Sequence, residues 1–264
     1  MLLAANENLD GFVLESPSDQ HALDLFKGSW SSILPTAYNY LKAGQIPLFE
    51  DRRIWWLVEA IGGVVGFNIL ELGPLEGGHT YMLEEHFGAA SILAVEANKQ
   101  AFLKCLVAKE ILGAKKSHFL LGDFIRLLES GTQKWDLIHS SGVLYHMRDP
   151  ARLIQLIGER TDRVFIWTHY FDEAKIKENP AARHHFGESW RHNVGGFEHT
   201  LYRQDYLETL GVKGFSGGND SYSCWLALDD IRGALRHFGF VNIAENFNDP
   251  DHQHGPCVTI AAWK

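Results

Sequence analysis

The residues that carry the clearest chemistry stand at the ends of three apolar runs. Glu71 precedes Gly73 and Gly77 where the first run passes through a glycine turn into a helical pattern. Glu96 ends the second run, and Asp123 follows the third. Because glycine has no Cβ, the turn lets a ligand approach the backbone closely. The three segments together predict one pocket for a nucleotide-like cofactor.

The residue types narrow the kind of cofactor. A carboxylate at Glu96 accepts hydrogen bonds from both ribose hydroxyls and repels a ribose 2′-phosphate, which argues against NADP. The glycines follow the spacing Gly73-x-x-x-Gly77 and not the G-x-G-x-x-G spacing that holds a pyrophosphate. Glu71 beside the turn repels a diphosphate but pairs with an ammonium group. S-adenosylmethionine has that ammonium and no phosphate, so these residues favour it.

At these positions the sequence resembles the class I S-adenosylmethionine-dependent methyltransferases, whose first motif reads acid-x-Gly-x-x-x-Gly. The resemblance covers about residues 50 to 170, and the run Trp135–Pro150 is similar to the family's fourth strand and following loop. It implies that Glu96 binds the ribose, that Asp123 and Phe124 contact the adenine, and that the product is S-adenosylhomocysteine. The predicted cofactor-binding residues are Glu71, Gly73, Gly77, Glu96, Ala97, Asp123, Phe124, Ser141 and Tyr145.

Each of these residues also has a purely structural interpretation. Gly73 and Gly77 serve equally well in a tight turn, Glu96 can be a solvated strand end, and Asp123 can cap the helix that follows it. The order of the residues favours the cofactor instead. One candidate ligand after each of three successive strand–helix units is the arrangement that a shared site would produce.

Methyl transfer asks little of a protein beyond alignment, because the sulfonium is already an activated electrophile. If the acceptor is a hydroxyl, a general base helps, and histidine titrates in a suitable range. Among fourteen histidines we take His146 and His169 as the catalytic candidates. Four more stand in segments expected near the pocket mouth: His184, His185, His192 and His199. A hydrogen-bonded structural role is the alternative for each of the six.

No metal site is predicted. Some quinone-pathway O-methyltransferases, which this region resembles distantly, carry a metal-binding acid-His pair after the fourth strand, but here Tyr145 precedes His146. The histidine pairs at 184–185 and 252–254 lack the spaced carboxylates that would complete a metal site.

The predicted acceptor is a small molecule that is methylated at a hydroxyl oxygen. The formal net charge of -9 argues against a broad phosphate-binding surface, and so against nucleic acid. After the fourth strand the chain reads His139-Ser-Ser-Gly, not the Asn/Asp-Pro-Pro-Tyr of resembling amino-directed methyltransferases. Aromatic residues either line an acceptor pocket or pack the segments around it. They are Trp55, Trp56, Tyr170, Phe171, Trp190, Phe197, Tyr202 and Tyr222.

Three other functions stay open at this point. The run Gly142–His146, with a fainter echo at Phe102–Gly113, resembles the wobble-uridine carboxymethyltransferases that act on transfer RNA. A binding protein that kept the fold and lost the chemistry is a second alternative, because fold alone does not define activity. The third is a nicotinamide-dependent oxidoreductase, which the glycine spacing disfavours. The sequence does not define the oligomeric state.

Composition sets the broad class of the protein. A chain of 264 residues with 45% hydrophobic residues can bury a full core. Cys105, Cys224 and Cys257 are widely spaced and odd in number, so we expect reduced thiols. The N-terminus lacks a basic region, and no stretch approaches the roughly 20 apolar residues that span a membrane. We therefore expect a soluble, cytoplasmic protein without membrane association.

The elements that must position the site alternate between strands and helices. Strands are expected at 67–72, 91–96, 116–121, 135–139 and 163–170, and helices at 80–86, 99–112, 124–130 and 151–160. Such alternation predicts a mainly parallel sheet with right-handed crossovers. After a helix at 226–238, strands at 240–247 and 256–263 form a closing hairpin. With the family's antiparallel last strand, the expected fold is α/β and Rossmann-like, with seven strands and helices on both faces.

The remaining segments divide the chain into four parts. We expect an N-terminal helical cap at 1–62, with helices at 21–41 and 48–61, and the S-adenosylmethionine-binding core at 63–170. Polar, aromatic and glycine-bearing sequence at 171–223 predicts an inserted lid containing one or two helices, because long structureless loops are uncommon. Residues 224–264 complete the core sheet.

Overall fold

The structure is a computed structural model that describes residues 11–212 and 217–264. Its centre is a seven-stranded sheet with the order β3-β2-β1-β4-β5-β10-β9. The strands are β1 (Asn68–Leu72), β2 (Ser91–Glu96), β3 (Ser117–Leu121), β4 (Leu137–Ser141), β5 (Arg163–His169), β9 (Asn242–Asp249) and β10 (Cys257–Trp263). β10 runs antiparallel to both neighbours, whereas β1 to β5 are parallel. The predicted fold class is confirmed, including the antiparallel last strand.

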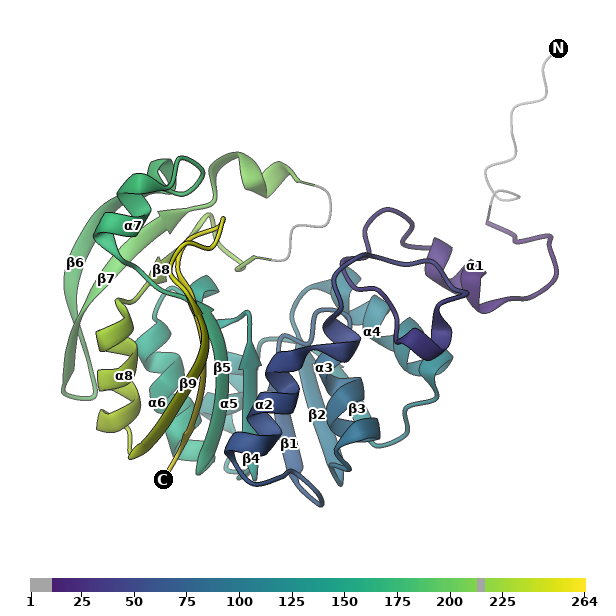
Figure 1. The fold of residues 1–264 in the computed structure, drawn as a ribbon, viewed down its shortest axis with the longest axis horizontal. Helices are drawn as coiled ribbons and strands as arrows, with labels where there is room; N and C mark the ends of the chain where they lie inside the picture. Colours follow the sequence, from purple (N-terminus) through teal and green to yellow (C-terminus); the bar gives the residue numbers. More distant parts are fainter. Residues whose placement is uncertain (1–10, 213–216) are drawn as a thin grey trace, which may run out of the picture.

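Helices cover both faces of this sheet (Figure 1). They are α2 (Arg52–Ala60), α3 (Gly78–Tyr81) with its π-helical continuation η3 (Met82–His86), α4 (Lys99–Leu112), α5 (Phe124–Ser130), α6 (Pro150–Arg160) and α8 (Leu228–His237). The inner strands β1, β2, β4, β5 and β10 are mostly buried because helices cover both faces of the sheet there, whereas the edge strands β3 and β9 are largely exposed. In β1, Leu70 packs in the cluster with α6 and α8, and Ile69 packs in the cluster with α2 and η3.

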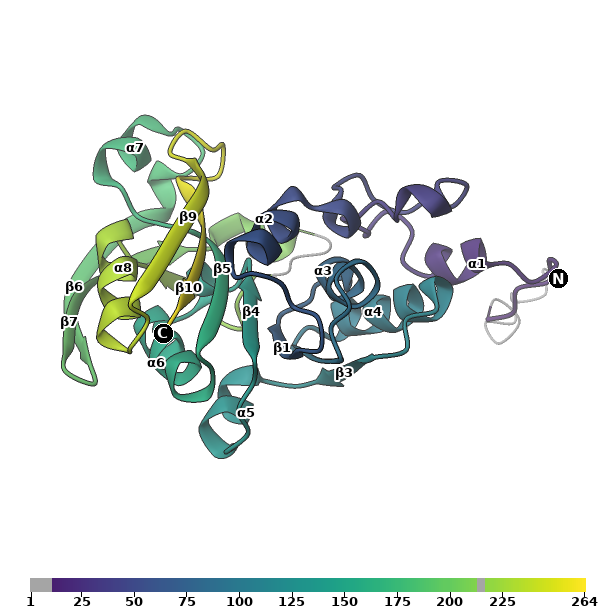
Figure 2. The ribbon, with the colours of Figure 1, turned by 60° about the horizontal axis from the view of Figure 1, so that its bottom comes forward.

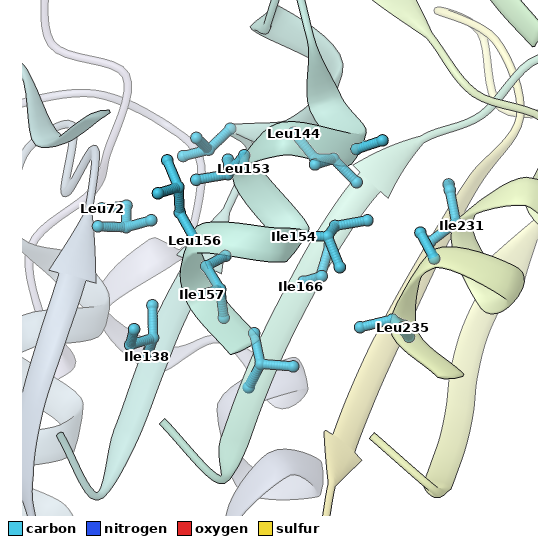
Figure 3. Packing of buried hydrophobic residues seen from close by; sticks show 14 of the residues in the cluster. Leu72, Ile138, Leu144, Leu153, Ile154, Leu156, Ile157, Ile166, Ile231 and Leu235 are labelled. Atoms are coloured by element: carbon cyan, nitrogen blue, oxygen red, sulfur yellow. The ribbon is translucent and has the colours of Figure 1, made fainter. Parts of the chain in front are cut away.

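The larger core lies between the sheet and the pair α6 and α8. Figure 3 shows Ile154 and Ile157 of α6 beside Ile138 of β4 and Ile166 of β5, all fully or almost fully buried. α6 begins where the Asp149 side chain accepts the Arg152 N–H, with proline in its first turn. This capped start fixes the loop between β4 and α6 above the strand ends.

The N-terminal part is less helical than expected. After α1 (Asp19–Asp24) come only the short 3₁₀ turns η1 (Thr36–Tyr38) and η2 (Leu48–Glu50), so the helix predicted over 21–41 is wrong beyond its first turn. Gly28 has a φ of +76° and Pro35 lacks an N–H, and both interrupt a helix. The helix predicted at 48–61 is confirmed as η2 and α2. Residues 1–10 of the expected cap lie outside the described residues.

The insertion forms a second, antiparallel sheet of three strands. It contains α7 (Glu173–Glu178), η5 (Arg183–His185), β6 (Phe186–Val194), β7 (Phe197–Asp205), η6 (Leu207–Gly211) and β8 (Tyr222–Trp225), with the strand order β6-β7-β8. The expected short helix is present, but the sheet was not predicted. Residues 213–216, in its glycine-bearing part, are outside the described residues. Figure 2 shows β6 and β7 beside α8, at the opposite end of the molecule from α1.

Among residues 11–212 and 217–264, no helix combines the length and apolar character that crossing a membrane requires.

Candidate active site

A cavity of about 720 Å³ opens at the carboxyl ends of the parallel strands. β1 lies between β2 and β4 in the sheet, so the chain crosses to opposite sides of β1 here. Ligands bind at such a switch point in open α/β sheets. The predicted site residues that line the cavity are Glu71, Gly73, Glu96, Ala97, Asp123, Phe124, Ser141 and His146. Gly77, Tyr145 and His169 are not among its lining residues.

The glycine turn shapes the floor of the cavity. Gly73 has a φ of +62°, and a Cβ there would lie 3.1 Å from the Val143 side chain. Gly77, with a φ of +78°, is the N-cap of α3, where a Cβ would lie 3.3 Å from Phe119. Gly73 therefore presents backbone to the cavity, and Gly77 turns the chain into the helix behind it.

Glu96 is a buried carboxylate and not a solvated strand end. Its two oxygens accept the N–H groups of Leu75 at 3.2 Å and Asn98 at 2.8 Å. Burial raises the pKa of Glu96, against the lowering effect of these N–H groups. Each carboxylate oxygen can accept a further hydrogen bond. Glu96, at the end of β2, is therefore a hydrogen-bond acceptor held in a defined position at the cavity.

Asp123 and Phe124 combine a structural role with a place in the cavity wall. The exposed Asp123 side chain caps α5 by accepting the Ile125 N–H at 2.8 Å. Phe124 is 8% exposed and packs into the large core cluster. The helix-cap interpretation of Asp123 is therefore correct, and the same cap holds its carboxylate at the cavity.

Glu71 sits deeper than the other acids. The Thr80 hydroxyl donates to its Oε2, and its Oε1 lies 3.6 Å from His139 Nδ1. Burial raises the pKa of Glu71 to about 7, with the Glu96 charge adding to the rise and the Thr80 bond opposing it. A bound cation beside Glu71 would favour its ionised form.

Sequence reasoning missed the contribution of the N-terminal part to this site. α2 brings Arg53 into the cavity wall, where its guanidinium bonds Asp51 and lies 4.7 Å from the Trp167 ring centroid. His79, which bonds Asp51, lines the cavity as well. An Asp-x-Arg sequence at a helix start was the available signal, since Asp51 caps α2 by accepting the Arg53 N–H.

His146 connects the cavity to the insertion. It ends η4 (Leu144–His146), the 3₁₀ turn after β4, and its Nδ1 lies 2.7 Å from the Tyr206 hydroxyl. The Tyr206 oxygen also accepts the Gly218 N–H at 3.0 Å. The ring keeps partial exposure to the cavity, but desolvation lowers the pKa of His146 to about 3. The imidazole is therefore neutral at physiological pH.

Tyr145 and His169 belong to an aromatic cluster outside the cavity lining. The His169 ring stacks on Trp225 with a centroid distance of 5.2 Å, and Tyr145 meets His169 edge-on at 4.7 Å. His169 Nδ1 is 2.8 Å from the Gly255 carbonyl oxygen, and burial lowers the pKa of His169 to about 4. Of the two catalytic candidates, His146 lines the cavity and His169 does not.

The other candidate histidines also lie apart from the cavity lining. His184 and His185 form part of η5, and His185 Nδ1 is 2.6 Å from the Asp205 carbonyl oxygen. His192 Nε2 lies 3.1 Å from Asp149 Oδ2. His199 is buried, with its ring centroid 5.4 Å from that of His192. The structure thus leaves His146 as the one of the six candidate histidines that lines the cavity.

Known proteins are similar to this chain in structure but not detectably in sequence. No protein-family profile and no curated protein sequence matches the chain. The N-terminal domain of EvdMO1, crystallised with S-adenosylhomocysteine (SAH) and D-fucose, is similar with a TM-score of 0.68 and 20% identity, over 93% of this chain and 94% of that one. A second crystal structure contains a longer EvdMO1 chain, and the present chain covers 46% of the length of that chain.

Two further solved structures are similar over most of the chain. The Burkholderia thailandensis 1,6-didemethyltoxoflavin-N1-methyltransferase, with substrate and SAH bound, has a TM-score of 0.53 and 15% identity, over 83% of this chain and 78% of that one. The Synechocystis magnesium protoporphyrin IX methyltransferase, with SAH bound, has a TM-score of 0.52 and 17% identity, over 81% of each chain. The chain therefore has the fold of the class I S-adenosylmethionine-dependent methyltransferases.

Proposed function

We propose that the chain is a methyltransferase that moves the methyl group of S-adenosylmethionine to a hydroxyl oxygen of a small molecule. The observation that carries this proposal is the convergence of Glu71, Gly73, Glu96 and Asp123 on one cavity. They lie at or just after the carboxyl ends of β1, β2 and β3, in the order of the methyltransferase motifs. The shared fold with SAH-bound methyltransferases supports the same cofactor.

The residues at the cavity suit the parts of this cofactor. Glu96 retains lone pairs for the two ribose hydroxyls, and Gly73 leaves room for the chain of the amino acid. Asp123 and Phe124 offer a hydrogen-bond acceptor and an apolar surface for the adenine. Glu71 provides the negative charge for the ammonium group.

The protein then needs few catalytic groups of its own. When bound, the cofactor supplies an activated methyl group, and the protein must align the acceptor oxygen with it. His146 is the residue we assign to the acceptor hydroxyl, because Tyr206 holds its Nδ1 and leaves Nε2 for the acceptor. With a pKa of about 3, the ring accepts a hydrogen bond but does not keep the proton, which passes on to water.

The acceptor class rests on two observations. The net charge of -9 disfavours a polyanionic substrate. The EvdMO1 domain was crystallised with D-fucose, a molecule rich in hydroxyl groups, and the N1-methyltransferase with 1,6-didemethyltoxoflavin. We therefore propose small hydroxylated compounds, with sugars and phenols as the first to screen.

Calorimetric titration with S-adenosylmethionine and SAH, beside NAD, tests the cofactor. We expect micromolar binding of both sulfur compounds and none of NAD; failure of both sulfur compounds to bind would overturn the proposal. Turnover is then measured on sugars, phenols and transfer RNA in separate reactions. Binding without turnover on any of them would favour the silent cofactor-binding alternative, and turnover on transfer RNA alone would favour the RNA-modifying one.

A further inference from the structure

Three metal-ligating side chains lie together beneath the cavity. Glu71 and His139 face each other across the neighbouring strands β1 and β4, and His79 stands in the first turn of α3. Each offers a ligating atom within 4.8 Å of the others. The exposed fractions of Glu71, His79 and His139 are 2%, 8% and 1%.

His139 is the residue that points to a missing ligand. Both of its ring nitrogens are buried without a hydrogen-bond partner, and Nδ1 is 3.6 Å from Glu71 Oε1, beyond hydrogen-bonding distance. The ring stacks on Phe165, a member of an apolar cluster, with a centroid distance of 4.8 Å. A buried polar group without a partner is destabilising, so an apolar residue would pack better here unless a ligand satisfies the imidazole.

Asp51 orients the second imidazole. Its Oδ2 lies 3.0 Å from His79 Nε2, and Arg53 in turn bonds Asp51. A carboxylate bonded to one ring nitrogen fixes a histidine and leaves the other nitrogen to ligate, as in the outer shell of metal sites.

We propose that Glu71, His79 and His139 bind one divalent transition-metal ion of the zinc class. Two imidazoles and one carboxylate are the ligands of open zinc sites, in which water or substrate takes the fourth position. Because Glu71 and His79 also line the cavity, that position lies on the cavity side. The site goes beyond methyl transfer, and it differs from the sequence-based expectation that the chain binds no metal. Because Glu71 is also the residue assigned to the ammonium group of the cofactor, the metal ion and the cofactor should compete for this carboxylate.

Two other groups of potential ligands in residues 11–212 and 217–264 are weaker candidates. The group around His169 includes Cys257, but the imidazole already contacts the Gly255 carbonyl. The group that includes His184 and Glu208 lies largely at the surface. These groups serve as internal controls, because the first contains a thiol and the second can be removed by a surface substitution.

The experiment measures metal binding without cofactor or acceptor, so that its failure is separate from failure of the methyltransferase proposal. The full chain is stripped with a chelator and titrated with Zn²⁺ and with Co²⁺, and bound metal is counted by mass spectrometry. We expect one ion per chain and a visible Co²⁺ spectrum without a thiolate charge-transfer band. No bound ion, or a thiolate band, would overturn the site.

Variants then assign the ligands. His139→Phe suits the apolar surroundings of the ring, and we expect it to weaken Zn²⁺ binding at least 10-fold; unchanged affinity would overturn the proposal. His184→Gln removes the surface group, and exposed His118→Gln is the matched control, so both should bind as the wild type does. If His139→Phe does not fold, one bound ion in His184→Gln with a Co²⁺ spectrum that lacks a thiolate band still assigns the site, and loss of the ion in His184→Gln would overturn it.

Discussion

His146 Nδ1 lies 2.7 Å from the Tyr206 hydroxyl, and this contact joins the loop after β4 to the inserted sheet. The Tyr206 oxygen also accepts the Gly218 N–H, so one hydroxyl orders both the candidate catalytic ring and the chain beside the cavity. The insertion therefore contributes to the site through Tyr206. It sets the orientation of the side chain that we assign to the acceptor.

Tyr206→Phe should lower kcat for the acceptor and leave S-adenosylmethionine binding unchanged. The substitution removes the partner of His146 Nδ1 and of the Gly218 N–H. An unsatisfied buried polar group costs about 1–3 kcal/mol, and the loss should fall at the lower end because both residues are half-buried. Turnover assays and calorimetry measure the two effects. Tyr202→Phe is the control, because Tyr202 stacks on Phe171 in the same insertion. Equal kcat in both variants would contradict the positioning role.

The pKa of His146 predicts how stability depends on pH. In the unfolded chain this histidine takes up a proton as the pH falls below about 6.5, but in the folded chain only near 3. Its contribution to the unfolding free energy is therefore fully present above about 6.5 and is lost as the pH falls toward 3. The slope should stay below about 1.4 kcal/mol per pH unit, the limit for a difference of one bound proton, because solvent at the partly exposed ring reduces the pKa shift.

Urea unfolding of the wild type and His146→Gln at several pH values between 7.5 and 4 measures this contribution. The difference in unfolding free energy between the two proteins should shrink as the pH falls. A difference that stays constant over this range would mean that the folded-state pKa of His146 is close to its ordinary value.

Glu96→Ala should weaken cofactor binding by about 1.5–3 kcal/mol, or roughly 10- to 150-fold, because charge-assisted hydrogen bonds to the ribose are lost. Calorimetry with S-adenosylmethionine measures the change. Since Glu96 also accepts the Leu75 and Asn98 N–H groups, melting temperatures are recorded beside it. Exposed Glu110→Ala on α4 is the control. Unchanged affinity in Glu96→Ala would refute the ribose assignment.

The core sheet could be predicted from the sequence because its signals are local. α4 was predicted with its observed bounds, since Asn98 accepts the N–H groups of Gln100 and Ala101 at its start and Gly113 adopts a positive φ at its end. Apolar runs of five to seven residues likewise marked the strands. Once the strands were predicted, the cavity residues Glu71, Glu96 and Asp123 could be predicted too, because they lie at or just after the ends of three of them.

Other features of the site could not be predicted, because they depend on contacts between distant parts of the chain. Glu71 meets His139 only because β1 and β4 are neighbours in a particular register, which periodicity does not reveal. Arg53 reaches the cavity through the packing of α2. The inserted hairpin had a local signal, Gly195-Gly196 with positive φ between two alternating runs, but polar and aromatic composition obscured it.

Gly78→Ala should destabilise the protein by about 1–3 kcal/mol, because overpacking against backbone forces a shift. An added Cβ would lie 2.7 Å from the Leu48 carbonyl carbon and oxygen, where η2 passes over the start of α3. Urea unfolding measures the loss. Gly187→Ala on β6 is the control, because a Cβ there meets open space. Equal stability of the two variants would show that η2 yields easily.

Lys104→Met should cost about 3–5 kcal/mol, because it leaves the buried Glu76 carboxylate without its cation. Lys104 Nζ is 3.0 Å from Glu76 Oε1, and the same carboxylate accepts the Ser31 and Ser32 N–H groups. This pair therefore anchors the N-terminal part, which carries Arg53, to the glycine turn.

A double-mutant cycle with Glu76→Gln isolates the contribution of the pair, measured as unfolding free energy in urea. The double variant should lose less stability than the sum of the two single variants, because neither buried charge is then left alone. Lys177→Met breaks a surface pair with Glu173 and should cause no measurable change. Strict additivity of the two substitutions would mean that Lys104 and Glu76 stabilise the fold independently, with the N-terminal part held by its apolar contacts with α4.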